Sequence, residues 1–358
     1  MNLSHPVRNL SRWRDIQVIL LKYGFDILID REEIQDIRNL LKKRFNVTLG
    51  SLEGATLPQK VRLMLQELGP TYVKLGQIIS SRNDLLGPAW SVELSKLQDN
   101  VPPFGFDEAR KTIEEDFGQP LEDIFLMFDQ EPIAAASIGQ VHKATLMDRS
   151  PVVVKVQRPR IQHQVQSDIE MMREIAALIE SRTDWGKRYG VLSIVEEFAR
   201  TLRDELDYNN EAANARRLRN NMESEAHVHV PQIYEELVSR RVLTMEAVQG
   251  VRIDDLEKLE EARIDRPFMA NIFITSIFKQ LLLDGYFHCD PHPGNLLVNL
   301  SERTLNYIDL GQMGSLLPEQ REQLCDMVEA IMRRDSKDMT RILLTIGIPY
   351  KKVDESRL

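Results

Sequence analysis

Cysteine is nearly absent from this 358-residue sequence, which contains only Cys289 and Cys325. Two cysteines without paired spacing provide neither a zinc knuckle nor a disulfide framework. Basic charge is also scarce, because the formal net charge is -9 and the isoelectric point is near 5.5. A nucleic-acid-binding protein needs a basic face for the phosphate backbone, so the composition argues against such a partner.

Long apolar runs are missing as well. The longest, residues 272–283, is interrupted by Lys279 and is too short to span a bilayer. The start of the chain has no signal-peptide pattern, so we expect neither a leader nor a transmembrane helix. An apolar content of 42% is still enough for a sizeable core, and the length accommodates two lobes with an extension.

The most informative segment that is present runs from His288 to Asn295 and is followed by an apolar strand and Asp309-Leu310-Gly311. Asp290 lies five residues before Asn295, and Asp309 lies fourteen residues after it. This is the spacing of a kinase catalytic loop and magnesium-binding loop. Carboxylate and amide oxygens suit magnesium, so Asn295 and Asp309 are candidate metal ligands and Asp290 would orient a nucleophilic hydroxyl or water. The alternative is a turn with a buried histidine and an aspartate cap.

Periodicity and turn residues predict the remaining organisation of the chain. Helices are expected over residues 1–50, 58–97, 106–117, 165–184 and 193–222, strands over 133–157 and 242–246, and a mainly helical region beyond Phe268 that contains a hairpin between Asp290 and Asp309. Pro58 suits a first helical turn, and Gly69-Pro70 predicts a break.

The first 25 residues combine an apolar helical face with a local charge of +3. The face contains Ile16, Ile19, Leu20, Tyr23 and, further along, Ile27. Such a helix could lie on an anionic membrane surface. The alternative is an amphipathic helix docked on the domain.

Lys155 ends a β-branched run and is the second candidate anchor. A lysine that points inward from a small-lobe strand can reach nucleotide phosphates if a carboxylate holds it, and Glu211 is the candidate partner. The alternative is a solvent-facing strand lysine. Residues 204–211 are acid-rich and expected on one helix, where Asp207 and Glu211 share a face that Glu205 does not. A merely solvated acidic face is the alternative here.

A glycine-rich nucleotide loop is also missing before Lys155. The chain has Ala134-Ala135-Ala136-Ser137-Ile138-Gly139-Gln140-Val141-His142 instead. Each alanine Cβ disfavours positive φ and a close backbone approach, so this loop should hold nucleotide differently from a glycine-rich one.

Together these motifs resemble the UbiB family of atypical protein-kinase-like proteins. The resemblance runs from about residue 55 to residue 315 and rests on Lys74-Leu75-Gly76-Gln77, the alanine-rich loop, the pair Glu205-x-Asp207, and the segment 288–295. It implies an α+β, two-lobed protein-kinase-like fold with an N-terminal helical extension packed over the active site. The expected parts are the extension (1–105), a small lobe with inserted helices (106–248) and an incomplete large lobe (249–358).

The resemblance also implies residue roles. Lys74 and Gln77 would cover the region of a protein substrate, with Glu205 and Asp207 as polar partners. Ala134, Ala135, Ala136 and Ser137 would meet the nucleotide, Lys155 and Glu211 would form the small-lobe ion pair, and Asp290 would be the acidic residue of the catalytic loop. Asn295 and Asp309 would bind magnesium, Met245 would be the gatekeeper, and Glu246 and Val248 would offer hinge backbone to adenine.

The resemblance further implies ATP (or ADP) and Mg as cofactors and an isoprenoid lipid or quinone-pathway molecule as partner. Quinone-biosynthesis proteins and an anionic membrane surface are further partners to expect, with peripheral attachment on the cytoplasmic side. Relatives continue beyond the 47 residues that follow Gly311, often into membrane-spanning segments. Two functions remain open: an ATPase or small-molecule kinase, and a nucleotide-sensing scaffold. A phosphotransferase of the aminoglycoside type shares the Asp290 loop but does not account for Lys74-x-Gly76-Gln77.

Overall fold

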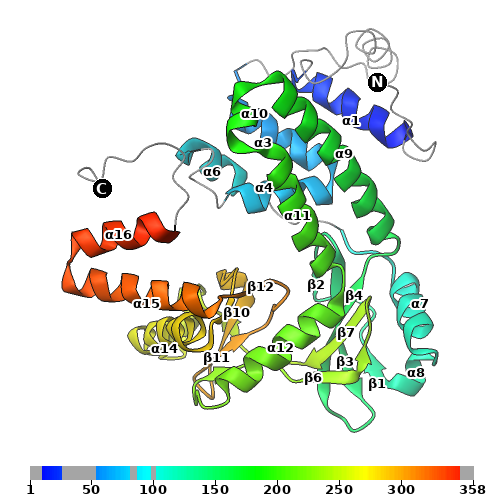
Figure 1. Cartoon of the computed structure of the whole chain (residues 1–358). Helices are drawn as coiled ribbons and strands as arrows, with labels where there is room; N and C mark the ends of the chain where they lie inside the picture. Colours follow the sequence, from blue (N-terminus) through cyan, green and yellow to red (C-terminus); the bar gives the residue numbers. More distant parts are fainter. Residues whose placement is uncertain (1–9, 26–53, 81–86, 98–101, 347–358) are drawn as a thin grey trace. The chain divides into compact units, whose positions relative to one another are not determined.

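A computed structural model of the chain describes residues 10–25, 54–80, 87–97 and 102–346 (Figure 1). Its contacts divide the chain into two compact units, and the division passes through three strands of one sheet. Unit 1 comprises residues 1–123, 128–143 and 155–206, and unit 2 comprises residues 124–127, 144–154 and 207–358. The three parts expected from the sequence, with boundaries at 105/106 and 248/249, stay a prediction.

Most of the described part of unit 1 is helical. Its helices are α1 (Leu10–Lys22), α3 (Leu57–Leu68), α4 (Pro70–Ser80), α6 (Pro88–Leu94), α7 (Phe106–Phe117), α9 (Ile161–Arg182), α10 (Asp184–Tyr189) and α11 (Val191–Glu205). The predicted break at Gly69-Pro70 is confirmed, since Gly69 has φ 108° and separates α3 from α4. Pro58 lies in the first turn of α3, and α7 has the predicted bounds.

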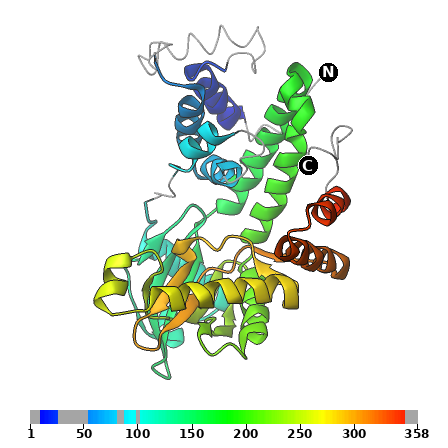
Figure 2. The same ribbon diagram turned by 90° about the vertical axis from the view of Figure 1, so that its left-hand side faces the viewer.

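The apolar face of α1 is buried in the core of unit 1. Ile16, Ile19, Leu20 and Tyr23 pack with residues of the other helices, including α9 and α11, which run side by side in Figure 2. Arg12 of α1 donates from Nε to Asp168 Oδ1 on α9 at 3.0 Å. The structure thus has the docked form of this helix, over Leu10–Lys22, while residues 1–9, Ile27 and the rest of 26–50 lie outside the described residues.

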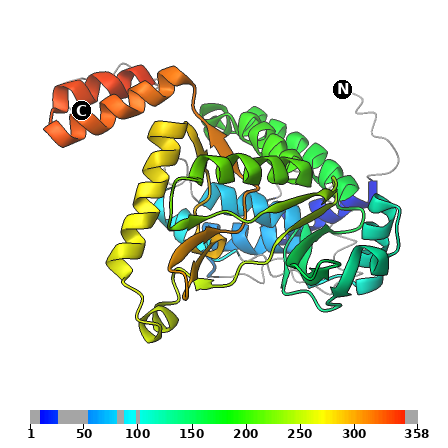
Figure 3. The same ribbon diagram turned by 90° about the horizontal axis from the view of Figure 1, so that it is seen from below.

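Unit 2 contains the remaining helices. They are α12 (Tyr208–Met222), α13 (Leu256–Glu261), α14 (Arg266–Phe278), the π-helical turn η2 (Lys279–Asp284), the 3₁₀ turn η3 (Pro293–Asn295), α15 (Pro318–Arg333) and α16 (Ser336–Ile346). Figure 3 shows α15 and α16 as a side-by-side pair. The short helix α8 (Leu121–Ile124) lies at a junction between the units.

Three sheets complete the fold. The first has the order β1-β3-β4-β7-β6, with β2 paired to β3; the second has the order β5-β11-β10-β8; and β12 pairs with β9. The bounds are β1 (Phe125–Phe128), β2 (Ala134–Ala135), β3 (Gly139–Leu146), β4 (Pro151–Gln157), β5 (Val228–His229), β6 (Ile233–Val238), β7 (Val242–Glu246), β8 (Val251–Arg252), β9 (Tyr286–His288), β10 (Leu296–Asn299), β11 (Thr304–Tyr307) and β12 (Met313–Ser315). The strands expected in 133–157 and 242–246 and the late hairpin are all present.

One predicted helix is wrong. Residues 193–222 do not form a single helix, because α11 ends at Glu205 and α12 begins at Tyr208. Asp207 lies between them in an extended conformation, and its carboxylate accepts a hydrogen bond from the Asn209 N–H at 3.1 Å. Aspartate favours this N-cap position because its side chain satisfies a helix N–H that lacks a partner. Asp207 therefore lies outside the helix whose face it was expected to share with Glu211.

Candidate active site

The hairpin of β10 and β11 sets the positions of the two candidate metal ligands. Its register pairs Leu296 with Tyr307, so the residues at its open end are Asn295 and Ile308. The Ile308 N–H donates to the Asn295 carbonyl at 3.0 Å. Because Asp309 follows directly, the hairpin brings Asn295 and Asp309 to the same end of unit 2.

Hydrogen bonds within the loop orient Asn295 and Asp290. Asn295 Nδ2 donates to the Asp290 carbonyl at 3.0 Å, and the His292 N–H donates to the same carbonyl at 2.7 Å. The amide nitrogen of Asn295 is thus used inside the loop, so its oxygen is the atom that it can offer to a cation. The Asp290 side chain is exposed, as a group that meets a reactant must be.

His288 connects the catalytic loop to Asp309. Its side chain is buried, Nδ1 accepts a hydrogen bond from the Asp290 N–H at 3.0 Å, and Nε2 lies 2.7 Å from the Asp309 carbonyl, to which it donates. An imidazole that accepts at one nitrogen and donates at the other is neutral. Burial lowers the pKa of His288, which maintains this form. The sequence also allowed a turn with a buried histidine, and in the structure the buried histidine is hydrogen-bonded to the backbone of both candidate acids.

Helix α12 holds the backbone of the Asp309-Leu310-Gly311 turn. Glu211 Oε1 accepts from the Leu310 N–H at 3.3 Å, and Asn214 Nδ2 donates to the Leu310 carbonyl at 2.9 Å. Tyr286 in turn donates from its hydroxyl to Asn214 Oδ1 at 2.7 Å. Asn214 has no motif around it, so sequence reasoning missed it.

The expected hinge follows β7. Met245 is buried, and the Glu246 N–H donates to the Gln232 carbonyl at 2.8 Å. The Glu246 carboxylate accepts a hydrogen bond from His229 Nε2 at 3.1 Å. Among the contacts of Glu246, this bond contributes most to lowering its pKa. The side chain of Glu246 is therefore structural, and its carbonyl and the Val248 backbone are the groups left to offer an adenine. Those roles stay a prediction.

In unit 1, Lys74 and Glu205 form an ion pair. Lys74 Nζ lies 2.8 Å from Glu205 Oε1, and the two side chains are 19% and 15% exposed. Gln77 instead donates from Nε2 to the Leu97 carbonyl at 3.3 Å. Gly76 between them faces its neighbours closely, because a Cβ there would lie 2.4 Å from Leu97 Cδ1 and 2.8 Å from Leu65 Cδ1. A larger residue at position 76 would therefore force the side chains of Leu97 and Leu65 to move, and the glycine allows their close packing.

Of the two acids predicted to be polar partners of Lys74 and Gln77, one contacts Lys74 and the other is engaged elsewhere. Glu205, at the end of α11, contacts Lys74. Asp207 caps α12, and its Oδ2 lies 4.0 Å from Arg240 Nε. A catalytic role for any of the four stays a prediction.

The alanine-rich loop is ordered as a strand and a turn. Ala134 and Ala135 pair with Val141 and Gln140, and the Ala136 N–H donates to the Gly139 carbonyl at 2.8 Å. Ser137 is buried. Within the described part of the chain, every non-glycine residue at positive φ is an arginine, so the alanines adopt conformations that suit a Cβ.

Gln140 and His142 had no role assigned from the sequence. In the structure they attach this loop to the chain segments around Phe104 and Asp129. Gln140 Oε1 accepts from the Phe104 N–H at 3.0 Å, and its Nε2 donates to His142 Nε2 at 2.8 Å. Since His142 Nε2 accepts, Nδ1 must donate to the Asp129 carbonyl, 2.8 Å away. Burial lowers the pKa of His142. Arg158 adds hydrogen bonds to the carbonyls of Ala136 (3.1 Å) and Pro102 (2.7 Å).

Lys155 lies on β4 and is partly buried. Two residues on, Gln157 Nε2 donates to the Leu206 carbonyl at 2.8 Å and ties the strand to the end of α11. Lys155 belongs to unit 1 and the buried Glu211 to unit 2. The expected ion pair between them stays a prediction.

The residues at the open end of the hairpin fit magnesium by their chemistry. Asn295 and Asp309 supply hard oxygen atoms, and a magnesium ion that bridges nucleotide phosphates usually takes only one or two protein ligands. Within residues 10–25, 54–80, 87–97 and 102–346, no group of three or more His, Cys, Asp or Glu side chains is placed to hold a metal ion. The pair of Asn295 and Asp309 matches the one or two protein ligands of an ion that arrives with phosphates.

The two buried histidines give a testable pH dependence. Burial lowers the pKa of His142 in unit 1 and of His288 in unit 2, so the folded chain takes up these protons only at lower pH than the unfolded chain, whose histidines titrate near about 6.5. The free energy of unfolding should therefore be constant above that pH and fall as the pH drops below it, by at most about 1.4 kcal/mol per pH unit for each histidine.

Denaturant unfolding at pH 7.5, 6.5 and 5.5 measures this effect. The His142→Gln variant should lose part of the slope, whereas the exposed His163→Gln control should keep it. A stability that does not change over this range would mean that neither histidine needs to be neutral.

Three features together make up a kinase-like fold. They are the six-stranded sheet, the loop that contains Asp290 and Asn295, and the hairpin that leads to Asp309. A family profile for the ABC1 atypical kinase-like domain matches residues 96–343. The chain belongs to this family, and the predicted UbiB resemblance and α+β class are confirmed.

The curated relatives agree. The chain is 38% identical over 301 residues to "Probable protein kinase UbiB" of Marinobacter nauticus, covering 83% of this chain and 55% of that one. It is 37% identical over 348 residues to the protein of the same name from Haemophilus ducreyi, covering 95% and 64%. An uncharacterized Synechocystis protein is 37% identical over 287 residues, covering 80% and 49%. The chain thus spans between about half and two thirds of the length of these relatives.

A solved structure also shares the fold. The complex of Rv3197 with erythromycin from Mycobacterium tuberculosis has a TM-score of 0.55 and 21% identity, and the match covers 91% of this chain and 78% of that one. Within the part of the chain that the structure describes, no helix has the length and apolar character needed to cross a membrane.

Proposed function

We propose that this chain is an ATP- and magnesium-dependent ATPase, or a kinase for a small molecule or lipid, that supports isoprenoid quinone biosynthesis. The observation that carries the proposal is the hydrogen-bonded arrangement in which His288 links Asp290 to the Asp309 backbone. Two acids and an amide held by the 288–295 loop and the hairpin that follows it are what phosphate chemistry requires. The quinone-pathway assignment rests on the resemblance to the UbiB family, to which the relatives named above give support by their sequence identity.

In this proposal each group has one task. Asn295 and Asp309 hold magnesium, which neutralises phosphate charge when bound. Asp290 accepts the proton of the attacking hydroxyl or water. Lys155 contacts the phosphates, and Met245, Glu246 and Val248 receive the adenine.

The extension would restrict the acceptor. Lys74, with its side chain mostly buried against Glu205, is the residue expected to limit access to the phosphates. A small acceptor, or water, is compatible with such a restriction. Peripheral attachment to an anionic membrane surface, on the cytoplasmic side, would bring a lipid acceptor within reach.

Phosphate release by the purified chain tests the proposal. We expect release from ATP that requires magnesium, measured with and without vesicles of anionic lipid. Neutral vesicles are the control for membrane charge. Binding of Mg·ATP without release under any of these conditions would contradict the enzymatic proposal.

A nucleotide-sensing scaffold is the second candidate, and the conformation of the alanine-rich loop favours it. Ala134 and Ala135 are held in a strand pair. An alanine backbone that is fixed in a strand pair approaches a phosphate group less readily than the backbone of a glycine-rich loop does. Nucleotide binding would then change the recruitment of lipids or biosynthetic proteins, with no phosphate released.

The Ala135→Gly variant tests the contribution of this loop. Glycine restores access to positive φ, so we expect a changed preference between ATP and ADP or new self-phosphorylation, at a cost of about 0.5–1 kcal/mol in stability. Competition binding and radiolabel incorporation measure the two effects. Ala262→Gly, which removes a methyl after α13, is the control. If Ala135→Gly behaves like the parent in both assays, the alanines contribute to packing and do not influence nucleotide selectivity or self-phosphorylation.

A further inference from the structure

Helix α14 ends in an unusual way. It continues into the π-helical turn η2, where the Gly285 N–H donates to the Gln280 carbonyl five residues earlier. Gly285 has φ 59°, after which the chain enters β9 and the catalytic loop. Single π-helical turns are rare and frequently occur at functional sites.

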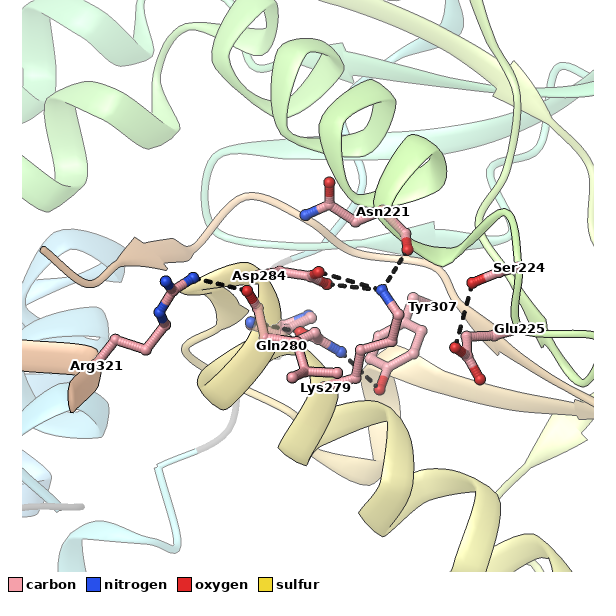
Figure 4. A network of polar contacts seen from close by, with 10 residues as sticks. Asn221, Ser224, Glu225, Lys279, Gln280, Asp284, Tyr307 and Arg321 are labelled. Atoms are coloured by element: carbon pink, nitrogen blue, oxygen red, sulfur yellow. Dashed lines mark hydrogen bonds and ion pairs between the residues drawn. The ribbon is translucent and has the colours of Figure 1, made fainter. Parts of the chain in front are cut away.

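Lys279 fixes this turn to α12. Its Nζ donates to the Asn221 carbonyl at 2.6 Å and to the two Asp284 carboxylate oxygens at 3.2 and 3.1 Å (Figure 4). The side chains of Lys279 and Asp284 are each 16% exposed. Arg321 donates to the Leu283 carbonyl at 2.8 Å. The turn therefore has a rigid attachment inside unit 2.

Gln280, the next residue, is completely buried and uses both ends of its amide. Its Oε1 accepts from the His288 N–H at 2.9 Å, and its Nε2 donates to the Tyr307 hydroxyl at 3.2 Å. The amide therefore bridges β9 to β11, and Figure 4 shows Gln280 next to Tyr307.

The direction of this hydrogen-bond chain is determined. Ser276 Oγ donates to the Phe273 carbonyl at 2.8 Å, so the Tyr307 hydroxyl, 2.7 Å from Ser276 Oγ, must donate to Ser276. Tyr307 then accepts from Gln280, and each of these groups has a partner. Tyr307 is also fully buried, so an apolar residue at position 280 would leave the His288 N–H without an acceptor and the Tyr307 hydroxyl with only its bond to Ser276.

The two strands that Gln280 joins lead directly to the candidate acids. His288 lies two residues before Asp290, and Tyr307 lies two residues before Asp309. We propose that Gln280 is a positioning residue that sets the spacing between Asp290 and Asp309 by bridging β9 and β11. The consequences for catalysis and metal binding rest on the proposed function, whereas the bridge itself does not.

Gln280→Met tests the bridge, because methionine has a similar length and no amide. Hydrogen exchange of the segment 286–292, followed by mass spectrometry, should accelerate about tenfold or more. Turnover should fall about 10- to 100-fold while the KM for Mg·ATP changes less than about threefold, as for a residue that orients a reactive group. Gln323→Met, on α15, is the matched control and should change neither quantity.

Tyr307→Phe is the second variant and removes one oxygen while keeping the buried ring. It should show the same two changes to a smaller extent, and it serves if Gln280→Met does not fold. If Gln280→Met folds and its hydrogen exchange in segment 286–292 equals that of the parent, the bridge is refuted. If Gln280→Met does not fold, the same result in Tyr307→Phe refutes it. A lower melting temperature with unchanged turnover per folded molecule also overturns the positioning role. A parent chain that binds no Mg·ATP would instead refute the proposed function, while the exchange experiment would still decide the bridge.

Discussion

The Asp309→Asn variant is expected to lose magnesium-dependent nucleotide binding. Asp309 supplies the only charge of the candidate ligand pair, and an amide cannot balance the second positive charge of the cation. Residues that merely support a metal ligand are worth about 10- to 100-fold in affinity, so loss of the ligand charge should raise the dissociation constant of Mg·ATP more than about 100-fold. Calorimetry with and without EDTA measures this.

The fold should survive the Asp309 change. The main-chain carbonyl of Asp309 receives the His288 hydrogen bond, and this bond does not depend on the side chain. The side-chain Oδ1 accepts from the Gly311 N–H at 3.1 Å, and an asparagine oxygen can replace it. Asp326→Asn, an exposed position on α15, makes the same charge change and should bind normally. If the variant and the parent have equal affinity for Mg·ATP, Asp309 is not a metal ligand.

The Asp290→Asn variant should separate catalysis from binding. A positioned general base contributes about 10²- to 10⁴-fold, so phosphate release should fall by that factor. Nucleotide affinity should stay within about threefold, because the hydrogen bonds around residue 290 use its N–H and its carbonyl, both retained by asparagine. Steady-state release and equilibrium binding on the same preparation measure the two quantities.

Cys289→Ser is the control for the Asp290 variant, since it changes the adjacent exposed side chain and leaves the carboxylate. Its release rate should match the parent. If Asp290→Asn releases phosphate as fast as the parent, Asp290 is not the base, and the scaffold proposal gains support. If the parent binds Mg·ATP and neither protein releases phosphate, the scaffold is the better description.

The local structure of the candidate active site was largely predictable from sequence because its contacts are local. The loop from Asp290 to Asn295 and the hairpin to Asp309 involve residues close in the chain, and alternation and turn residues determine their form. The glycine at position 69 and the proline after it likewise marked a helix boundary that the structure contains. Local physics is sufficient for such features.

The break at Asp207 was missed although a local signal existed. Helical periodicity continues on both sides of it, which hid an aspartate in a position typical of an N-cap. Recognising that signal would have divided the acid-rich stretch into the end of one helix, with Glu205, and the start of the next.

Gln280, Asn214 and His142 were beyond sequence reasoning for a different reason. Each lies among residues that determine its secondary structure but not its partners, and at least one partner of each lies outside its own helix, strand or turn. Gln280 was one of only two strongly polar residues, with Lys279, in the apolar run 272–283. A polar residue there indicates a buried hydrogen bond, but tertiary structure is needed to identify its acceptor.

The tight contact at Gly76 has a consequence for how genetic variants of this chain should be interpreted. Any larger residue there must displace Leu97 or Leu65 before it can influence phosphate chemistry. Loss of function at this codon would therefore indicate first a disturbed packing of Leu65 and Leu97, whereas changes at Lys74 or Gln77 would test the role proposed for that helix.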